Sequence, residues 1–349
     1  RDWRNAEMEK AVALPATEVK EKAQAVLVGV GVPKADAEQT VDVLMDAELC
    51  GVESHGLMRL NAYVERLAKG MIAPAPEIQI TVRDAVAHVD GGNGLGQVVM
   101  CRAADLCTQL AQKFGVGIAS VNHSNHFGTA SYYARSIAKQ GCIGFVASVA
   151  GPTMAPFGGM DLLLGTNPFS VAFPGRDMAF CADMATSAAA KGKIRIYAQK
   201  GEAIPLGWAL DTEGHDTTDP QAAIRGILLP MAGHKGYALA MVVDMLCGLL
   251  SHAALSGESS SIFQTDRPAN TGHFATAIDI AHFLPPDEFA QRAQEWFDTL
   301  RKSKKRPGVS RIFIPGEPEA ERFAAAGANV RILRQTMESL EQNYQKYGV

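Results

Sequence analysis

Two histidines lie three residues apart in residues 122–128, which read Asn-His-Ser-Asn-His-Phe-Gly. An apolar run at residues 116–121 precedes this stretch and a small-residue helical pattern follows at residues 129–135, so we expect a turn that joins a strand to a helix. Imidazole titrates near neutral pH, and such loops often carry catalytic groups. The stretch therefore predicts proton transfer by His123, His126 or both, with a helix cap or a packed surface residue as the alternative for one of them.

A third histidine has a cationic neighbour. His55 lies in residues 51–56, Gly-Val-Glu-Ser-His-Gly, which interrupt a helical pattern, and Arg59 follows one turn later. Ser54 is a candidate cap for the helix that resumes at residues 57–67. The spacing predicts an imidazole beside a permanently charged guanidinium.

A carboxylate and two hydroxyls follow an apolar strand pattern near the middle of the chain. Residues 180–187 read Phe-Cys-Ala-Asp-Met-Ala-Thr-Ser, which puts Asp183, Thr186 and Ser187 at a strand tip where a ligand could meet exposed backbone amides. An N-cap box for a following helix explains the same spacing equally well.

A basic pair stands between glycines where a long apolar helix begins. His234 and Lys235 precede the helical pattern of residues 237–250. The positive end of a helix dipole with a lysine beside it favours an anion or a phosphate; a helix cap with an exposed lysine is the alternative.

A glycine-rich turn at residues 91–97, Gly-Gly-Asn-Gly-Leu-Gly-Gln, lies between a strand and a helix. It resembles a dinucleotide fingerprint at first, but Gln97 stands where the third glycine of G-x-G-x-x-G belongs. We therefore expect a plain tight turn rather than a Rossmann phosphate loop.

The composition is that of an ordinary globular protein. The chain has 349 residues, of which 47% are hydrophobic and 20% charged, and its net charge is -4, so it can form two substantial domains and has no overall basic footprint for nucleic acid. The basic cluster at residues 301–306 is expected to be a solvated loop, with an anion contact as the alternative.

The cysteines and the apolar runs predict a cytoplasmic protein. None of the six cysteines has CxxC spacing, and buried thiols in a reducing compartment are expected in a chain of this size. The longest apolar run, residues 236–250, is interrupted by Asp244 and is too short for a membrane span. Residues 1–10 are charged and lack the apolar core of a signal peptide.

The remaining pattern predicts an α/β chain. Helices are expected up to about residue 70, a mobile polar loop at residues 256–261, and two charged amphipathic helices at the end. The other expected strands are residues 86–90, 144–149, 169–173 and 272–279, and the other expected helices are residues 98–114 and 289–300.

Taken together, the motifs resemble the malate/L-lactate dehydrogenase superfamily, the NAD(P)-dependent 2-oxoacid and imino-acid reductases that are distinct from Rossmann-type lactate and malate dehydrogenases. Seven motifs occur in the family's order between about residues 51 and 317. They are Gly-Val-Glu-Ser-His-Gly-Leu-Met-Arg-Leu at 51–60, Asn-His-Ser-Asn-His-Phe-Gly at 122–128, Pro-Phe-Gly-Gly at 156–159, Gly-Thr-Asn-Pro at 165–168, Asp-Met-Ala-Thr-Ser at 183–187, Gly-His-Lys-Gly at 233–236 and Gly-His-Phe at 272–274.

The resemblance implies a non-Rossmann NAD(P)-binding fold with a mixed central sheet and a helical domain built from both chain ends. On this basis residues 1–75 and 285–349 are expected to form the helical dimerisation and substrate part. Residues 76–284 are expected to form the α/β catalytic and cofactor-binding part. The implied assembly is an intertwined homodimer.

The resemblance also assigns the site. His55 and His126 are implied as the catalytic acid/base groups, and which of them is the principal one stays open. Arg59 is implied to hold the substrate carboxylate, with Ser54 and Asn125 beside it. The implied contacts to NAD or NADP are Asn167, Pro168, Asp183, Met184, Ala185, Thr186, Ser187, His234, Lys235, Gly316, Glu317 and Pro318.

The chain departs from the family pattern at residues 191–196, which are more basic than expected. Arg195 could contact the 2′-phosphate of NADP, but an exposed helix face explains it equally well. The choice between NAD and NADP therefore stays open.

The predicted activity is NAD(P)-dependent interconversion of a 2-hydroxy acid and a 2-oxo acid, with no bound metal. Histidine suits the proton transfer, and arginine suits a carboxylate. Alternatives within the family are reduction of a cyclic imino acid, diketogulonate or sulfopyruvate, and oxidation of ureidoglycolate. Outside it, a zinc hydrolase could use His123 and His126 at i, i+3 spacing, which metal analysis would detect. A catalytically inactive dinucleotide-binding partner protein is the third alternative.

Overall fold

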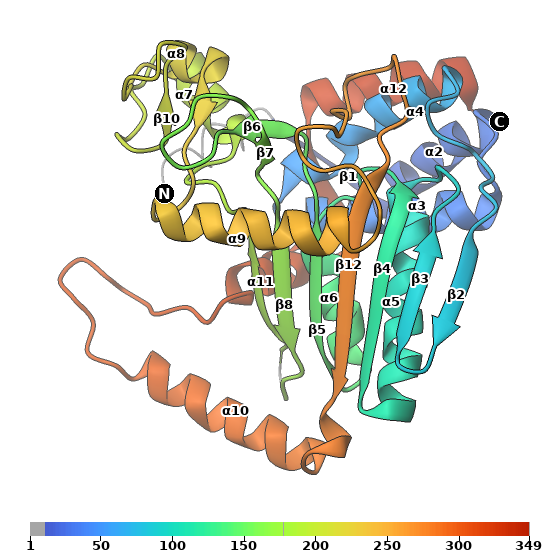
Figure 1. The fold of residues 1–349 in the computed structure, drawn as a ribbon, viewed down its shortest axis with the longest axis vertical. Coiled ribbons are helices and arrows are strands. Elements are labelled where there is room, and N and C mark those ends of the chain that lie inside the picture. The colour runs from blue at the N-terminus through green and yellow to red at the C-terminus, as the bar shows by residue number, and fades with distance from the viewer. Residues whose placement is uncertain (1–10, 177, 349) are drawn as a thin grey trace.

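The computed structural model describes residues 11–176 and 178–348, so the predicted charged N-terminus at residues 1–10 lies outside the described residues. Its centre is a seven-stranded mixed sheet in the order β2-β3-β4-β12-β5-β8-β9 (Figure 1). Among these described strands, only the neighbours β3 and β4 are parallel to each other. The strands are β2 (Gln79–Arg83), β3 (Val86–Asp90), β4 (Val116–Ser124), β12 (Thr271–Asp279), β5 (Cys142–Ser148), β8 (Phe169–Phe173) and β9 (Phe180–Met184). This confirms the expected mixed sheet.

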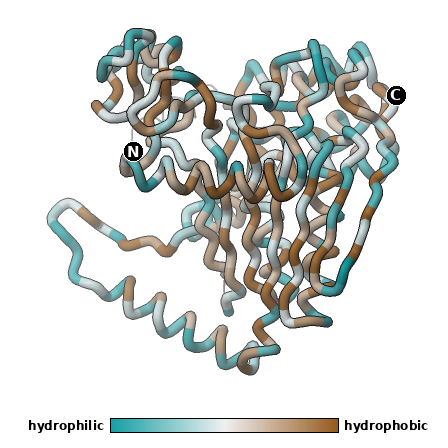
Figure 2. The backbone as a smooth tube through the Cα atoms, viewed as in Figure 1, coloured by the Kyte–Doolittle hydropathy of each residue, from teal (hydrophilic) through white to brown (hydrophobic). Residues whose placement is uncertain are grey.

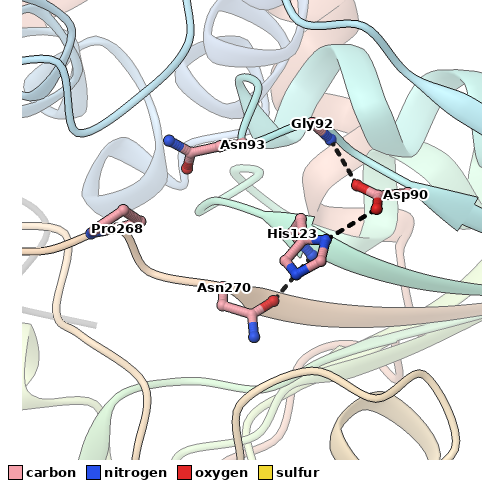
Figure 3. A pocket seen from close by; sticks show the side chains of 6 residues that line it. All are labelled: Asp90, Gly92, Asn93, His123, Pro268 and Asn270. Carbon is pink, nitrogen blue, oxygen red and sulfur yellow. Dashed lines mark hydrogen bonds and ion pairs between the residues drawn. The ribbon is translucent and has the colours of Figure 1, made fainter.

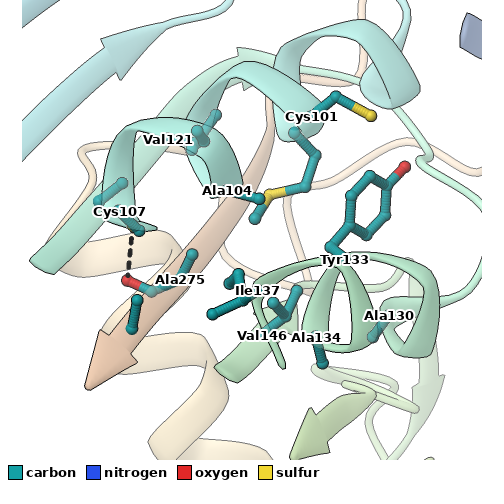
Figure 4. Packing of buried hydrophobic residues seen from close by; sticks show 14 of the residues in the cluster. Cys101, Ala104, Cys107, Val121, Ala130, Tyr133, Ala134, Ile137, Val146 and Ala275 are labelled. Carbon is teal, nitrogen blue, oxygen red and sulfur yellow. Dashed lines mark hydrogen bonds between the residues drawn. The ribbon is translucent and has the colours of Figure 1, made fainter. Parts of the chain in front are cut away.

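Helices α5 (Gly96–Phe114) and α6 (Ala130–Lys139) cover one face of this sheet. Small residues let the layers approach closely: Ala104, Ala134 and Ala275 are almost fully buried between helix and strand (Figure 4). A methyl group on Gly117 of β4 would lie 2.0 Å from the carbonyl oxygen of Cys107 on α5. The close contact holds the start of β4 against α5, and the histidine motif begins at the other end of this strand.

The two chain ends share a second core, as Figure 1 shows at upper right. Helices α2 (Ala16–Gly29), α3 (Lys34–Leu49), α4 (Leu60–Ala68) and α12 (Arg334–Tyr347) surround it. Strand β1 (Ala11–Pro15) pairs antiparallel with β13 (Asn329–Leu333), which follows α11 (Glu317–Ala326). The sequence analysis predicted these helices but neither of the two strands. The predicted division into domains stays a prediction.

A smaller four-stranded sheet, in the order β10-β11-β6-β7, lies apart from the main one. It consists of β10 (Ala209–Leu210), β11 (Ile227–Leu228), β6 (Pro152–Met154) and β7 (Leu164–Gly165), accompanied by α7 (Lys191–Lys200), α8 (Pro220–Arg225) and α9 (His234–Asp244). Its strands have two or three residues, too few to show an alternating pattern in the sequence.

Helix α10 (Pro286–Arg301) extends away from the body and is followed by an arm that returns to α11 (Figure 1). The Phe289 and Phe297 rings of this helix stack on the Phe173 and Phe180 rings, with centroids 6.5 and 6.3 Å apart. Among the described residues, no helix has both the length and the apolar character that a membrane crossing requires.

The structure corrects four local expectations. Strand β4 continues to Ser124, so the histidine stretch begins inside a strand. Ser54 does not cap α4; its hydroxyl is 2.9 Å from Nδ1 of His55. The next helix after residues 183–187 begins only at Lys191, which excludes the N-cap box there. Residues 256–261 are not a free polar loop, because Ser256, among others, is buried and hydrogen-bonded to Asp244.

Candidate active site

His126 is held by a chain of hydrogen bonds from two helices. Its Nδ1 lies 2.6 Å from the Tyr63 hydroxyl on α4, which in turn accepts a hydrogen bond of 2.8 Å from the Gln97 amide on α5. The Gly128 N–H, 3.4 Å away, also points at Nδ1. The Tyr63 hydroxyl can donate its proton to Nδ1, or its oxygen can accept from both Gln97 and Nδ1–H, so the contact suits either tautomer of His126. In both tautomers Nδ1 is engaged within the protein and Nε2 is the nitrogen that a ligand can reach.

His55 stacks on His126, with ring centroids 5.7 Å apart and planes inclined by 21°. Its Nδ1 is 2.9 Å from the Ser54 hydroxyl. Within the described part of the chain, neither Nε2 atom has a hydrogen-bond partner. The two rings therefore present free nitrogens that could exchange a proton with a ligand.

The turn that carries His55 is built on a buried carboxyl group. Glu48 on α3 is 6% exposed, and its Oε1 accepts the Leu57 N–H at 2.7 Å. A methyl group on Gly56 would lie 2.5 Å from the same oxygen, which explains the glycine after His55. The other oxygen, Oε2, is buried without a hydrogen-bond partner in the described residues, and burial raises the pKa of Glu48 to about 8.

Arg59 points its charge toward the two rings. Its Nε donates to the Ser54 carbonyl oxygen at 2.6 Å, and its guanidinium lies 5.3 Å from the centroid of the Phe263 ring. Within residues 11–176 and 178–348, no carboxylate lies within ion-pair distance of Arg59. Its terminal nitrogens are thus available to an anionic ligand.

This environment keeps both imidazoles neutral near pH 7. Burial, with a contribution from the Arg59 charge, lowers the pKa of His55 to about 4. Burial, followed by His55 and Arg59, lowers the pKa of His126 well below its usual range. A bound anion at Arg59 would offset the guanidinium charge and raise both pKa values.

Asn125 is buried beside His126, and its side chain is engaged within the protein. Its amide nitrogen donates to the Gly94 carbonyl oxygen at 2.8 Å and to Asn93, and its oxygen accepts from Arg66 at 3.4 Å. The structure therefore gives Asn125 a positioning role; its predicted contact with the substrate stays a prediction.

His123 faces a different part of the molecule from His126. Its half-exposed ring pairs with Asp90 at 3.0 Å in a surface hollow of about 350 Å³ that Asn93 and Asn270 also line (Figure 3). The two histidines thus share no partner. Within the described residues, no group of three or more His, Cys, Asp or Glu side chains could hold a metal ion, so the geometry gives the zinc alternative no support.

Another motif histidine is part of the core. His273 is fully buried between the hydroxyls of Ser148 and Ser124, each 2.9 Å from a ring nitrogen, and its ring stacks on Phe127. Burial lowers its pKa to about 3. It therefore supports the residues next to His126 without facing the site.

Three of the predicted cofactor segments meet at Thr186. Its N–H and hydroxyl both donate to the Thr166 carbonyl oxygen, at 2.8 and 2.9 Å. Its own carbonyl oxygen accepts the Met231 N–H at 2.9 Å and lies 2.9 Å from where a methyl group on Gly236 would be. The Asp183–Ser187, Gly165–Pro168 and His234–Lys235 motifs are thereby brought together, and Ser187 forms a bridge with Pro230.

Asn167 connects the segments around Thr186 to α9 through buried hydrogen bonds. It is fully buried with a left-handed backbone (φ 32°), and its amide group contacts Asp244 and Ala240 on α9 as well as Ser256. Its side chain is therefore engaged within the protein. Pro168 follows on the half-buried surface, where its carbonyl oxygen accepts the Ser148 N–H.

Solvent-accessible groups remain around Thr186. Asp183 and Met184 are exposed at the end of β9, Ala185 is half-buried, and His234 and Lys235 are exposed in the first turn of α9.

The turn before α11 packs against β9. A methyl group on Gly316 would lie 3.0 Å from the Cys181 nitrogen, which donates to the Pro315 carbonyl oxygen at 3.1 Å. The buried carboxylate of Glu317 accepts from Arg301, Arg311 and the Ile314 N–H, and half-buried Pro318 follows it in α11. Glu317 thus stabilises the turn through contacts within the protein.

The sequence analysis missed Tyr63, Gln97, Glu48 and Phe263. A signal existed for three of them. Tyr63 follows Arg59 by one helical turn, Glu48 ends an apolar helix, and Gln97 replaces the expected glycine. Phe263 lies in a segment without a motif, so nothing in the sequence connects it to Arg59.

Comparison with known proteins gives matches over nearly the whole chain. The family model for malate/L-lactate dehydrogenase matches residues 14–341. Malate dehydrogenase from Pyrococcus horikoshii is 38% identical over 338 residues, covering 93% of this chain and 92% of the relative. The structure of sulfolactate dehydrogenase from Methanocaldococcus jannaschii superimposes with a TM-score of 0.92 at 36% identity, covering 97% of this chain and 98% of the other.

Two further relatives have names that specify a cofactor. The NADP(+)-dependent (2R)-3-sulfolactate dehydrogenase from Chromohalobacter salexigens is 35% identical, covering 84% of this chain and 89% of the relative. The NAD(+)-dependent ureidoglycolate dehydrogenase from Escherichia coli is 32% identical, covering 83% of each.

The buried carboxyl of Glu48 predicts a pH-dependent stability. Its pKa is raised to about 8 in the folded protein, so between its unfolded value of about 4.3 and pH 8 the folded chain binds the extra proton. Stability should therefore fall as pH rises through this window, by up to about 1.4 kcal/mol per pH unit. Glu48→Gln should flatten this dependence in urea unfolding at pH 5 to 8.5.

Glu38→Gln, at an exposed position on the same helix, is the matched control and should keep the wild-type slope. Any pH-independent cost of burying the amide in Glu48→Gln cancels because slopes are compared. An identical slope in wild type and Glu48→Gln would show that Glu48 ionises freely.

Proposed function

Because this chain belongs to the malate/L-lactate dehydrogenase family, we propose that it interconverts a 2-hydroxy acid and a 2-oxo acid by hydride transfer. The protein is an oxidoreductase that acts on a CH–OH group, and its cofactor is NAD or NADP. The observation that carries the proposal is the pair of neutral, stacked imidazoles of His55 and His126 beside the Arg59 guanidinium, which has no carboxylate partner among the described residues.

The residues around Thr186 fit a dinucleotide. Exposed His234 and Lys235 stand at the N-terminal end of α9, where backbone dipole and side-chain charge suit phosphate groups. Asp183 lies in β9, and the turn at Gly316 packs against the same strand; both offer polar contacts beyond the phosphates. When bound, the nicotinamide supplies or accepts the hydride.

Arg59 holds the carboxylate of the acid in this proposal. Ser54 occupies only its Nε, at 2.6 Å, which leaves both terminal nitrogens for a bidentate contact. A planar and permanently charged group suits this task better than an ammonium.

His126 and His55 are the groups that transfer the proton. Nδ1 of His126 is engaged by Tyr63, so a proton exchanged with the substrate moves at Nε2. In oxidation the neutral imidazole, with its own proton on Nδ1, accepts the hydroxyl proton at Nε2. In reduction the carboxylate at Arg59 raises the pKa of the rings, so that an imidazolium can donate a proton to the carbonyl oxygen. Both histidines remain candidates for the principal role.

The proposal does not distinguish between several related acids that differ in their side chain. Malate, sulfolactate, ureidoglycolate, diketogulonate and cyclic imino acids all carry a carboxylate next to the reacting carbon, so Arg59 and the histidines suit each of them. NADH and NADPH should be tested with pyruvate, oxaloacetate, 2-oxoglutarate, sulfopyruvate, diketogulonate and piperideine-2-carboxylate, and ureidoglycolate with NAD(P)+. We expect rapid oxidation of NADH or NADPH with one of the 2-oxo acids. Turnover of piperideine-2-carboxylate alone would change the proposed substrate to a cyclic imino acid. Turnover of none of these compounds would contradict the proposal.

We also propose that the enzyme is a homodimer. One face of α9 and the turn after it exposes Leu239, Val242, Met245 and Leu249, each at least 38% accessible, and Figure 2 shows hydrophobic residues along this helix. A continuous apolar face of this kind is typical of an interface. Light scattering that gives the 37.2 kDa mass of a single chain would contradict the proposal.

The six buried, unpaired cysteines are consistent with a reducing compartment, and we propose a cytoplasmic location.

Arg59→Lys tests the carboxylate clamp. A lysine keeps the charge but cannot make the bidentate contact, so the KM for the 2-oxo acid should rise at least about tenfold, in line with a loss of 1.5–3 kcal/mol for a charged hydrogen bond. The KM for NAD(P)H should change less than twofold. Lys235→Arg is a contrasting variant that should affect only the cofactor. An unchanged KM for the acid in Arg59→Lys would rule out the clamp.

A further inference from the structure

The loop at residues 261–267, far from Arg59 in sequence, is hydrogen-bonded to α4, the helix that follows Arg59. Arg66 on α4 is 1% exposed, and its guanidinium donates to the carbonyl oxygens of Gln264 and Arg267 in residues 261–267. Lys69, one turn later, donates to the Thr265 hydroxyl at 2.8 Å. Burying a guanidinium is costly unless its donors are used, so these contacts fix the loop to α4 firmly.

The loop itself is a tight turn that presents one aromatic ring. The Gln264 N–H donates to the Ser261 carbonyl oxygen at 2.9 Å, and the Ser261 N–H donates to the Gln264 side chain at 2.7 Å. The Phe263 N–H donates to the Ser261 hydroxyl at 3.3 Å. Phe263 at the tip is 60% exposed, yet the Arg59 guanidinium lies over its ring, 5.3 Å from the centroid.

The guanidinium is thereby held at two places. The Ser54 carbonyl oxygen accepts from Nε, and the guanidinium carbon lies over the Phe263 ring. The edge formed by the two terminal nitrogens has no partner among the described residues. A ligand can therefore approach along this edge, which is the geometry of a bidentate carboxylate contact.

We propose that Phe263 positions Arg59 for edge-on binding of the acid's carboxylate and shields one face of the guanidinium from water. This rests on the proposed function, because the acid is the ligand assigned there to Arg59. Through Arg66, which also contacts Asn125, the same loop is linked to the residue next to His126. Phe263 is thus a positioning residue that acts through Arg59.

Kinetics of three variants test this role. Phe263→Leu removes the ring but keeps apolar bulk, and it should raise the KM for the 2-oxo acid about three- to fivefold, the range expected for an exposed cation–π contact. The KM for NAD(P)H should change less than twofold, and Phe263→Tyr should restore the wild-type value. Phe283→Leu, at another exposed phenylalanine, is the matched control.

A chemical readout makes the test independent of turnover. The rate at which phenylglyoxal modifies Arg59, followed by peptide mass spectrometry, should rise at least about threefold in Phe263→Leu if loss of the cation–π partner uncovers the guanidinium. It should stay at the wild-type rate in Phe263→Tyr and Phe283→Leu. Unchanged modification together with an unchanged KM for the acid in Phe263→Leu would overturn the proposal. A wild-type protein that reduces no acid would overturn the proposed function, and the modification rates would still decide whether Phe263 covers Arg59.

Discussion

The guanidinium charge of Arg59, held beside two imidazoles without a carboxylate partner among the described residues, is the constraint on which the site depends. A carboxylate at this place would occupy the terminal nitrogens and remove the attraction for an acid. Instead the guanidinium donates a hydrogen bond to the carbonyl oxygen of Ser54 and makes a cation–π contact with the ring of Phe263. The uncompensated charge lowers the pKa of His55 and His126 beyond the effect of burial. If the acid binds at Arg59 as proposed, its carboxylate would offset this charge and couple substrate binding to proton transfer through one electrostatic interaction.

The scaffold keeps this arrangement by close backbone contacts. A methyl group on Gly96, where α5 begins, would lie 2.1 Å from the Asn125 carbonyl oxygen, and one on Gly91 would lie 2.8 Å from that of His123. The glycine-rich turn at residues 91–97 therefore lets α5 pack closely against the end of β4, which explains its glycines without a Rossmann phosphate loop. That approach places Gln97 within reach of Tyr63 and so orients His126.

The sequence predicted contacts between residues that are close together along the chain, but it could not predict contacts between residues that are far apart. Helical spacing predicted that Arg59 follows His55 by one turn, and in the structure the two residues lie at the ends of successive 3₁₀ turns. The helix expected at residues 237–250 is observed as α9, which begins earlier, at His234. The side-chain engagement of Asn125 and Asn167 depends on residues far apart along the chain, so the motifs alone could not predict these contacts. The pairing of β1 with β13 joins the two ends of the chain, and short-range periodicity carries no information about such a partner.

The most direct test of this account is to measure the ring pKa values of His55 and His126 by NMR of histidine-labelled protein. Without ligand, both should titrate below the ordinary value of about 6.5, and both should rise when oxamate, an unreactive analogue of a 2-oxo acid, binds together with reduced cofactor. In Arg59→Gln the free values should already be higher and oxamate should shift them little. Values at or above about 6.5 in the free protein that do not respond to oxamate would contradict the coupling of charge, substrate and proton at this site.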